Sequence, residues 1–215
     1  MFLSFEGLDG SGKSTQIRLL AGRLRTYGQA VRVVREPGGT VLSEAIRTLL
    51  LDPALAIEPT AELLLFSAAR AQLVQTEIKP ALAAGEIVIA DRFYDSTTAY
   101  QGGGRGVAGV DWLRGFHPFV TGGLAPRRTY LLDVPAEVAS DRRRARAGAE
   151  DRMEAAGDAF FARVRAAYRE LAASEPDRFC VLDGTLPPET LHEQVAADLA
   201  RLGGRIARIF PAAGR

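Results

Sequence analysis

The sequence predicts a single α/β domain in which helices cover both faces of a parallel, five-stranded sheet. Short apolar runs alternate with longer helical patterns along the whole chain, which is typical of a doubly wound sheet. A glycine-rich stretch that fits a phosphate-binding loop follows the first apolar run. The 215 residues are 47% hydrophobic, which is enough for one well-buried core, so we predict one domain over residues 1–215.

The predicted strands are short runs of β-branched, aromatic and leucine residues, which is typical of strands buried on both faces. In chain order they are FLSF, VRVV, IVIA, TYLL and FCVL, at residues 2–5, 31–34, 87–90, 129–132 and 179–182. Strands joined in this way by helices favour parallel pairing.

The predicted helices fill the intervals between the strands. They cover residues 14–27, 41–51, 60–83, 110–116, 136–146 and 158–173, and a last helix follows Pro187. Thr40 fits the N-cap of the helix over 41–51. Glu44 lies in its first turn, where the helix dipole stabilises a carboxylate. Residues 101–106 (QGGGRG) and the arginine-rich residues 141–152 are predicted as mobile segments, and the last residues, 203–215, carry little information.

The charge balance and the cysteine count exclude several classes of protein. The net charge is +1, so no strong basic field indicates a nucleic-acid partner or a membrane surface. No apolar run reaches the length of a membrane span. Cys180 is the single cysteine, which rules out an internal disulfide and is typical of a cytoplasmic protein.

The stretch GLDGSGKS, residues 7–14, matches the phosphate-loop pattern G-x-x-x-x-G-K-[ST] in full. It follows a predicted strand and opens a predicted helix, so backbone N–H groups and the helix N-terminus would surround an anion. Lys13 would reach the β- and γ-phosphates, and Ser14 would ligate Mg²⁺. A glycine turn with a chance lysine is the alternative, and the strand–loop–helix context argues against it.

Several classes of nucleotide-binding protein share such a loop. The sequence contains no asparagine, so it lacks the N-K-x-D element that reads guanine in GTPases. Asp91 and Asp133 each end an apolar strand, but neither begins the acidic pair that many motor ATPases carry. A small kinase with two phosphate sites and a closing lid is therefore favoured. Either aspartate fits support of Mg²⁺, and we prefer Asp91, because the residues after it resemble a binding loop rather than a helix start.

Other candidate site residues follow predicted strands, where open α/β sheets bind ligands. Arg92 comes directly after the third strand and suits bidentate binding of an acceptor phosphate. Arg35 and Glu36 end the second strand, with an exposed ion pair as the alternative for both. Phe66 and Arg70 are spaced to share a helix face and would suit a base. Spacing alone favours a core phenylalanine with a solvated arginine.

The arginine-rich segment DRRRARAGAEDR, residues 141–152, is either a solvated helix face or a lid. Gly10 leaves the phosphate loop without an arginine, so a lid would have to supply positive charge to the transferring phosphoryl group. A phosphate acceptor is already an oxyanion near neutral pH, so it needs positioning and charge neutralisation rather than a general base.

These motifs together resemble bacterial thymidylate kinase. FEGLDGSGKST, REPGGT, LLFSAAR, DRFYDSTTAYQGGGRG and RRRARAGAEDRME occur in that family's order and approximate spacing, over roughly residues 2–200. The resemblance implies a P-loop fold with strand order 2-3-1-4-5 and a lid near residues 141–154. It also implies the reaction ATP + dTMP → ADP + dTDP with Mg²⁺, and a homodimer.

The resemblance also implies roles for individual residues. The ATP-binding loop would comprise Gly7, Leu8, Asp9, Gly10, Ser11, Gly12, Lys13, Ser14 and Thr15. The dTMP-binding residues would be Asp9, Glu36, Arg47, Phe66, Arg70, Arg92, Thr97, Tyr100 and Gln101. Phe66 would stack on thymine, Arg70, Thr97 and Gln101 would hold its edges, and Tyr100 would crowd the 2′ position. The catalytic set would be Lys13, Asp9, Arg92 and the lid arginines Arg143, Arg146 and Arg152, and Mg²⁺ would be held by Ser14 and Asp91.

Two rivals remain at the level of sequence. One is a kinase for another nucleotide or small metabolite, which a panel of monophosphates distinguishes. The other is a nucleotide-dependent switch or ATPase that contacts nucleic acid through its arginine run. The near-zero net charge argues against this second rival.

Overall fold

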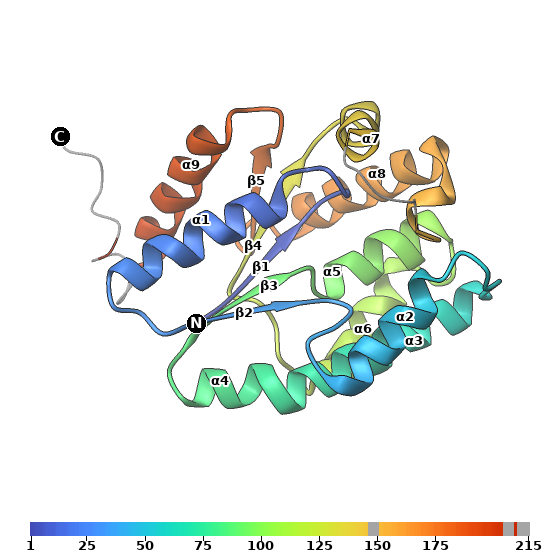
Figure 1. Ribbon diagram of the computed structural model, residues 1–215, viewed down its shortest axis with the longest axis horizontal. Helices are drawn as coiled ribbons and strands as arrows, with labels where there is room; N and C mark the ends of the chain where they lie inside the picture. The colour runs from blue at the N-terminus through green and yellow to red at the C-terminus, as the bar shows by residue number, and fades with distance from the viewer. Residues whose placement is uncertain (146–150, 204–208, 210–215) are drawn as a thin grey trace.

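A computed structural model describes residues 1–145, 151–203 and 209, and it confirms the five-stranded, all-parallel sheet (Figure 1). The strand order is β2-β3-β1-β4-β5, as the family resemblance implies. The strands are β1 (Phe2–Glu6), β2 (Val31–Arg35), β3 (Ile87–Asp91), β4 (Arg128–Asp133) and β5 (Phe179–Asp183). Because β1 is central, the loop that follows it lies at the middle of the carboxyl edge, between the ends of β3 and β4.

The helices agree with the predicted alternation. They are α1 (Lys13–Thr26), α2 (Val41–Leu51), α3 (Pro59–Leu73), α4 (Lys79–Ala83), α5 (Tyr94–Thr97), α6 (Val110–Thr121), α7 (Ala136–Arg144), α8 (Asp158–Ser174) and α9 (Pro188–Arg201). Two π-helical segments, η1 (Val74–Ile78) and η2 (Thr98–Gly104), extend α3 and α5, and a short 3-10 turn, η3 (Glu154–Ala156), precedes α8. Thr40 caps α2 as predicted, because its hydroxyl accepts the N–H of Ser43 at 3.0 Å.

Two helical layers bury the sheet. On one face α1 and α9 pack on β1 and β4, where Leu20 and Val195 meet Phe5. On the other face α3, η1 and α8 contribute Ile78 and Val164 to the core. Figure 1 shows α1 and α9 together on one side of the strands, and α2, α3 and α6 gathered on the other.

The glycine-rich segment after β3 differs from its prediction. Residues 101–106 were expected to form a mobile loop, but most of them continue a helix, because η2 runs to Gly104 and packs against α8. An added Cβ at Gly103 would collide with Ala167, and one at Gly104 would collide with Phe160. The glycines therefore permit close helix packing rather than loop motion.

Two helix predictions need smaller corrections. The helix expected over 60–83 contains the π-helical segment η1, an irregularity that hydrophobic periodicity does not reveal. The helix expected over 110–116 continues through Pro118 and ends at Thr121, where Gly122 adopts the left-handed conformation with φ 59°. Among the described residues, no helix has the length and apolarity needed to cross a bilayer.

Candidate active site

The phosphate loop joins β1 to α1 at the centre of the carboxyl edge. Gly7, Gly10 and Gly12 have φ values of 133°, 90° and 100°, which favour glycine. A Cβ at Gly7 would lie 2.5 Å from the carbonyl oxygen of Leu132, and one at Gly10 would lie 2.6 Å from that of Ala139. The loop is thus pressed between β4 and α7, and it leads directly into the α1 N-terminus, where an anion is favoured.

Lys13 is the first residue of α1 and is buried in the loop. Its Nζ donates to the carbonyl oxygens of Gly7 and Leu8 at 3.1 and 2.9 Å and lies 3.9 Å from Asp9 Oδ1. Burial, and next the Arg92 charge, lower the pKa of Lys13 to about 8. A phosphate anion beside Nζ would favour the charged ammonium and offset this cost.

The two candidate Mg²⁺ aspartates have different surroundings. The hydroxyl of Ser14 donates to Asp91 Oδ2 at 3.0 Å, which places both oxygens beside the phosphate loop. Asp133 instead accepts two hydrogen bonds from Arg165, at 2.6 and 2.9 Å. The geometry therefore favours Asp91. The reason given from the sequence was wrong, because a helix begins within three residues of each aspartate, at Tyr94 and Ala136.

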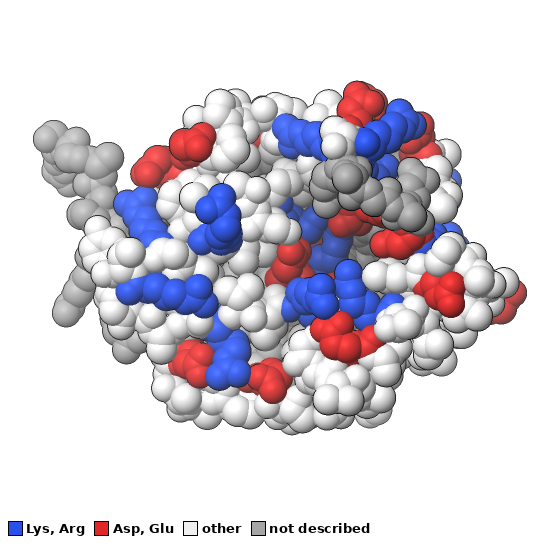
Figure 2. All heavy atoms as spheres, viewed as in Figure 1, with Lys and Arg blue, Asp and Glu red and all other residues white. Residues whose placement is uncertain are grey.

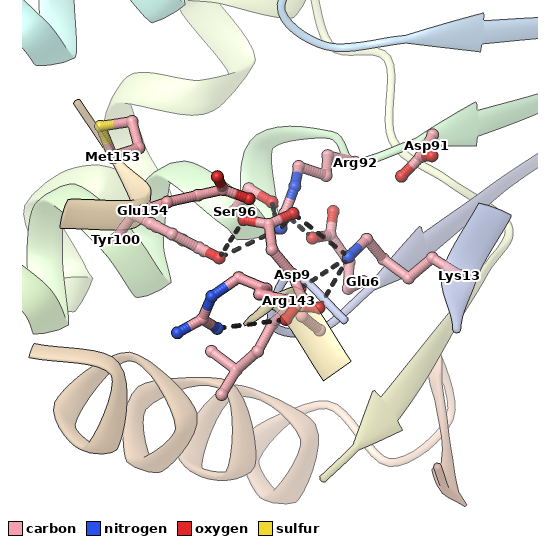
Figure 3. Close-up of polar contacts among 12 residues, drawn as sticks. Glu6, Asp9, Lys13, Asp91, Arg92, Ser96, Tyr100, Arg143, Met153 and Glu154 are labelled. Carbon is pink, nitrogen blue, oxygen red and sulfur yellow. Dashed lines mark hydrogen bonds and ion pairs between the residues drawn. The ribbon is translucent and has the colours of Figure 1, made fainter. Parts of the chain in front are cut away.

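Arg92 is the centre of the charged network drawn in Figure 3. One terminal nitrogen donates to Asp9 Oδ1 at 2.8 Å and to the Tyr100 hydroxyl at 3.1 Å. The other donates to the hydroxyls of Ser96 and Tyr168 at 3.1 and 3.2 Å. Burial would raise the pKa of Asp9, but the Arg92 and Lys13 charges outweigh it and hold this pKa well below its usual range. Asp9 therefore stays ionised between the two cations.

The backbone of Arg92 is unusual, because its φ of 71° is in the left-handed region. A non-glycine residue there carries strain that the surroundings must offset. The N–H of Arg92 donates to the carbonyl oxygen of Phe5 at 3.0 Å, and the next N–H, of Phe93, donates to Glu6 Oε1 at 2.7 Å. The strand end is thus held on both sides of the strained residue.

Glu6 is a fully buried carboxylate beneath Arg92 that sequence reasoning missed. Besides the Phe93 N–H, it accepts the Ser96 hydroxyl at 2.6 Å and the Tyr168 hydroxyl at 2.7 Å, both on Oε2. Burial, with a smaller contribution from Asp95, raises the pKa of Glu6 to about 7. A charged residue at the end of an apolar strand was the available signal, since such a group needs buried partners.

Replacing Glu6 with glutamine is expected to change how stability depends on pH. The folded pKa of about 7 exceeds the ordinary value of 4.5, so the charged carboxylate destabilises the fold above pH 7. This cost is relieved as pH falls from about 7 towards 4.5. Wild type should therefore gain Tm relative to Glu6→Gln over this range, and a difference that is constant with pH would contradict the assignment. Glu170→Gln, on the exposed face of α8, is the control and should show no such trend.

A cavity of about 230 Å³ opens beside this network. It is lined by all nine of the residues that the resemblance implies for dTMP: Asp9, Glu36, Arg47, Phe66, Arg70, Arg92, Thr97, Tyr100 and Gln101. Pro37, Leu51, Ser96, Asp151, Met153 and Glu154 also line it and were not predicted. Figure 2 shows acidic and basic side chains meeting in a hollow on this face of the molecule.

Arg70 and Phe66 line the cavity together, one turn apart on α3. The expectation from spacing that Arg70 is solvated was wrong, because only 2% of it is exposed. Its guanidinium donates to Glu36 Oε2 at 2.7 Å, to the Thr97 hydroxyl at 2.8 Å and to the Phe93 carbonyl oxygen at 3.3 Å. Glu36 Oε1 is buried and has no hydrogen-bond partner among the described residues. A polar ligand edge here would therefore meet an acceptor.

The arginines expected at the acceptor phosphate are divided. Arg47 lines the cavity and donates to the carbonyl oxygen of Pro37 at 3.0 Å. Arg35 is exposed and pairs with Glu44 at 3.0 Å, so it has the surface ion pair that the sequence offered as the alternative. Glu36 does not share that arrangement, since it is buried against Arg70.

The two predicted lid arginines that the structure describes lie at different places. Arg143 of α7 donates to the carbonyl oxygen of Asp9 at 3.2 Å and packs over the Phe161 ring. Arg152 does not line the cavity and pairs with Glu62 at 2.6 Å. Arg146 lies outside the described residues. Arg142, which was not predicted, donates to the carbonyl oxygens of Gly10 and Gly184 at 3.3 and 2.9 Å.

Glu62 connects the cavity wall to the lid. This buried carboxylate accepts the Gln101 amide at 2.9 Å, Arg105 at 3.2 Å and Arg152 at 2.6 Å. The hydrogen bonds to Gln101, Arg105 and Arg152 lower the pKa of Glu62 although burial alone would raise it. Glu62 therefore ties Gln101, in the cavity wall, to Arg152, in the lid.

The chain is similar to known proteins along nearly its whole length. The family model described as thymidylate kinase matches residues 5–195. The thymidylate kinase of Chlorobium chlorochromatii is 48% identical, covering 93% of this chain and 94% of the relative. That of Thermomicrobium roseum is 50% identical, covering 94% and 95%. A crystal structure of thymidylate kinase from Ehrlichia chaffeensis aligns with a TM-score of 0.73 at 36% identity, covering 91% of this chain and 95% of that one.

Proposed function

The chain belongs to the thymidylate kinase family and phosphorylates dTMP to dTDP, and we propose that it takes the phosphoryl group from ATP bound with Mg²⁺. One observation carries the proposal for the site. Lys13 of the phosphate loop and Arg92 of the cavity converge on the same carboxylate, Asp9, at 3.9 and 2.8 Å. The two places where phosphates would bind are thus adjacent.

We assign the two ends of the transfer to different residues. Lys13 and the loop N–H groups hold the donor phosphates, and Arg92, with Arg47, holds the acceptor phosphate of dTMP. Phe66 and Arg70 bind thymine at the far end of the cavity, and Glu36 supports Arg70. No general base is needed, so catalysis consists of alignment and charge neutralisation. Arg143, already beside the backbone of Asp9, is the lid arginine placed to add positive charge near the phosphate loop.

The residues present fit a magnesium ion. A hydroxyl and a carboxylate oxygen, from Ser14 and Asp91, meet beside the phosphate loop, and Mg²⁺ prefers such hard oxygen ligands together with phosphate oxygens. We propose that these two residues hold the ion, which neutralises phosphate charge when bound. Among the described residues, no three His, Cys, Asp or Glu side chains are grouped so that they could hold a metal ion by themselves.

A panel of nucleoside monophosphates with Mg·ATP tests the substrate assignment. We expect dTMP to be phosphorylated far faster than dCMP, UMP or AMP, because the cavity combines a stacking ring with Arg70 and Tyr100. dUMP should fall behind dTMP by only about 10- to 200-fold, since one methyl group contributes about 1–3 kcal/mol. Turnover of another monophosphate in preference to dTMP would overturn the assignment and leave the fold unaffected.

We also propose a homodimer formed through α2, α3 and α6. Phe119 is 83% exposed, Val41 is 93% exposed and Leu64 is 55% exposed. On α6, Phe116 stacks against both Trp112 and Phe119, with ring centroids 4.9 and 6.5 Å apart. α3 packs against both α2 and α6, and Figure 1 shows the three helices gathered on one side of the sheet. Exposed apolar surface of this kind is typical of an interface.

Phe119→Glu is expected to convert the dimer to a monomer, because it puts a charge in the middle of the apolar surface. Sedimentation velocity measures the change. Tyr27→Glu is the matched control, since Tyr27 is 53% exposed at the end of α1, away from this surface. A wild-type protein that sediments as a monomer would refute the dimer.

We place the protein in the cytoplasm, which the free, half-buried Cys180 supports.

A further inference from the structure

A second cavity, of about 200 Å³, lies between α5, α6, α8 and the loop that follows α6. It shares no lining residue with the cavity described above. Tyr94 and Thr98 form one wall, His117 and Thr121 of α6 form another, and Leu124 and Leu171 close the sides. Nothing in the proposed reaction uses this space.

The two cavities lie on opposite faces of one short helical segment, residues 94–101. Tyr94 and Thr98, one turn apart, line the second cavity. Ser96 and Tyr100, also one turn apart, line the cavity assigned to dTMP. Side chains four residues apart share a helix face, so a shift of the segment moves both walls together. The two cavities therefore share this segment as a wall.

The second cavity does not coincide with the proposed dimer surface. Phe116 and Phe119 form the exposed aromatic side of α6. His117, Thr121 and Arg114, which line the cavity, fall on the opposite side of the helix at 3.6 residues per turn. Dimer formation through the aromatic side would leave the cavity open.

Two buried polar atoms on α6 lack hydrogen-bond partners among the described residues, His117 Nδ1 and Thr121 Oγ1. His117 Nε2 pairs with the Thr98 hydroxyl at 2.7 Å. Burial, and next the Arg70 charge, lower the pKa of His117 to about 3, so the ring is uncharged at neutral pH. An unpaired buried polar group is unfavourable, and an occupant with one donor and one acceptor would supply the missing partners.

The charges around the cavity disfavour an anion. Asp95 and Glu175 line it, and both pair with Arg178 at 2.7 Å. Two carboxylates thus face one guanidinium, which leaves a slight excess of negative charge. Arg114, at the rim, is exposed and pairs with Asp111 at 3.2 Å. A nucleotide is therefore a poor occupant, whereas a neutral molecule meets apolar walls and two unpaired polar atoms.

We propose that this cavity is a regulatory binding site for a small, flat, uncharged heterocycle that donates one hydrogen bond and accepts another. The occupant contacts one face of residues 94–101 and holds this segment in place. It so favours dTMP binding on the opposite face. The coupling rests on the dTMP site proposed above, whereas binding of the occupant does not. Because coupling between two ligands is reciprocal, dTMP strengthens occupant binding by the same factor.

Benzimidazole at pH 8 is the probe, because it is flat and uncharged and has one ring N–H and one ring nitrogen acceptor. Isothermal titration with the full-length protein should show binding that saturating dTMP strengthens about fivefold. Loss of binding on adding dTMP would place the probe in the dTMP cavity and overturn the proposal, as would no binding at all. Turnover of dTMP without probe is measured in parallel, so failure of the proposed function is seen separately.

Two variants locate the probe. Thr121→Val keeps the shape of the side chain and removes its hydroxyl, and it should weaken benzimidazole binding severalfold. Ala125→Trp, at the exposed rim, should block entry while leaving dTMP turnover unchanged. Ala30→Trp, exposed in the loop before β2, is the matched control and should bind the probe as wild type does. Unaltered binding in both cavity variants would overturn the site, and binding without a lower KM for dTMP would overturn the coupling.

Discussion

Lys13→Ala is expected to lower kcat for dTMP phosphorylation by at least about 10²- to 10³-fold, the loss seen when one preorganised charge-stabilising group is removed. Lys13 is the cation placed inside the phosphate loop, and the loop itself has glycine at position 10, so no neighbouring loop side chain replaces the charge. Steady-state kinetics with saturating dTMP and Mg·ATP measures the effect.

The fold should tolerate this change. Burial already disfavours the charged ammonium, as its pKa of about 8 indicates, so removal relieves a cost as well as losing two hydrogen bonds. Thermal unfolding should therefore show a small change in Tm. Lys79→Ala is the natural control, because Lys79, at the start of α4, is the second of the two lysines in the chain and lies far from the loop. Activity that survives in Lys13→Ala would show that the loop does not carry the transfer.

Arg92→Ala is expected to reduce kcat/KM for dTMP by about 10²- to 10³-fold while changing the KM for ATP little. The guanidinium donates to four side chains around the cavity, so its loss removes the proposed phosphate clamp and frees Asp9 and Tyr100. Arg92→Lys should recover only part of the loss, because an ammonium keeps the charge but not the planar fork. Equal effects on dTMP and ATP would remove Arg92 from the acceptor site.

Stability measurements separate the chemistry of Arg92 from its backbone strain. Alanine keeps the unfavourable φ of 71°, whereas glycine adopts it freely. Arg92→Gly should therefore unfold at higher temperature than Arg92→Ala, by the equivalent of about 1 kcal/mol, with the same loss of activity. Arg169→Ala, exposed on α8, controls for loss of an arginine and should match wild type in both measurements.

The sheet could be predicted almost completely, because buried parallel strands and their helices leave a strong alternating pattern. Each strand end differs from the prediction by at most one residue, as at β1, where Glu6 extends the predicted run. The segment after β3 could not be predicted in the same way. Its glycines are typical of a loop in isolation, and only their contacts with Ala167 and Phe160 explain why they are helical.

A contiguous sequence motif was sufficient to predict the phosphate loop, but no such motif predicts the cavity. The loop is contiguous, so spacing alone indicates Lys13 and Ser14. The cavity brings together residues from α2, α3, η2 and the lid, and the role of Arg70 depends on Glu36 and Thr97, which are distant in sequence. Family resemblance supplied these positions. Neither source indicated Glu6 or Tyr168, because their partners are buried hydroxyls and an N–H that only the fold reveals.

The carboxylate of Glu62 sets a limit on redesigning substrate choice. Gln101, Arg105 and Arg152 all contact it, so the pocket proposed for thymine and the segment around Arg152 share one anchor. A library that varies Gln101 to accept a different base also alters the electrostatic balance that holds Arg152. Productive variants should therefore arise in pairs or triples across residues 62, 101, 105 and 152. Evolution of a new specificity in this scaffold faces the same coupling.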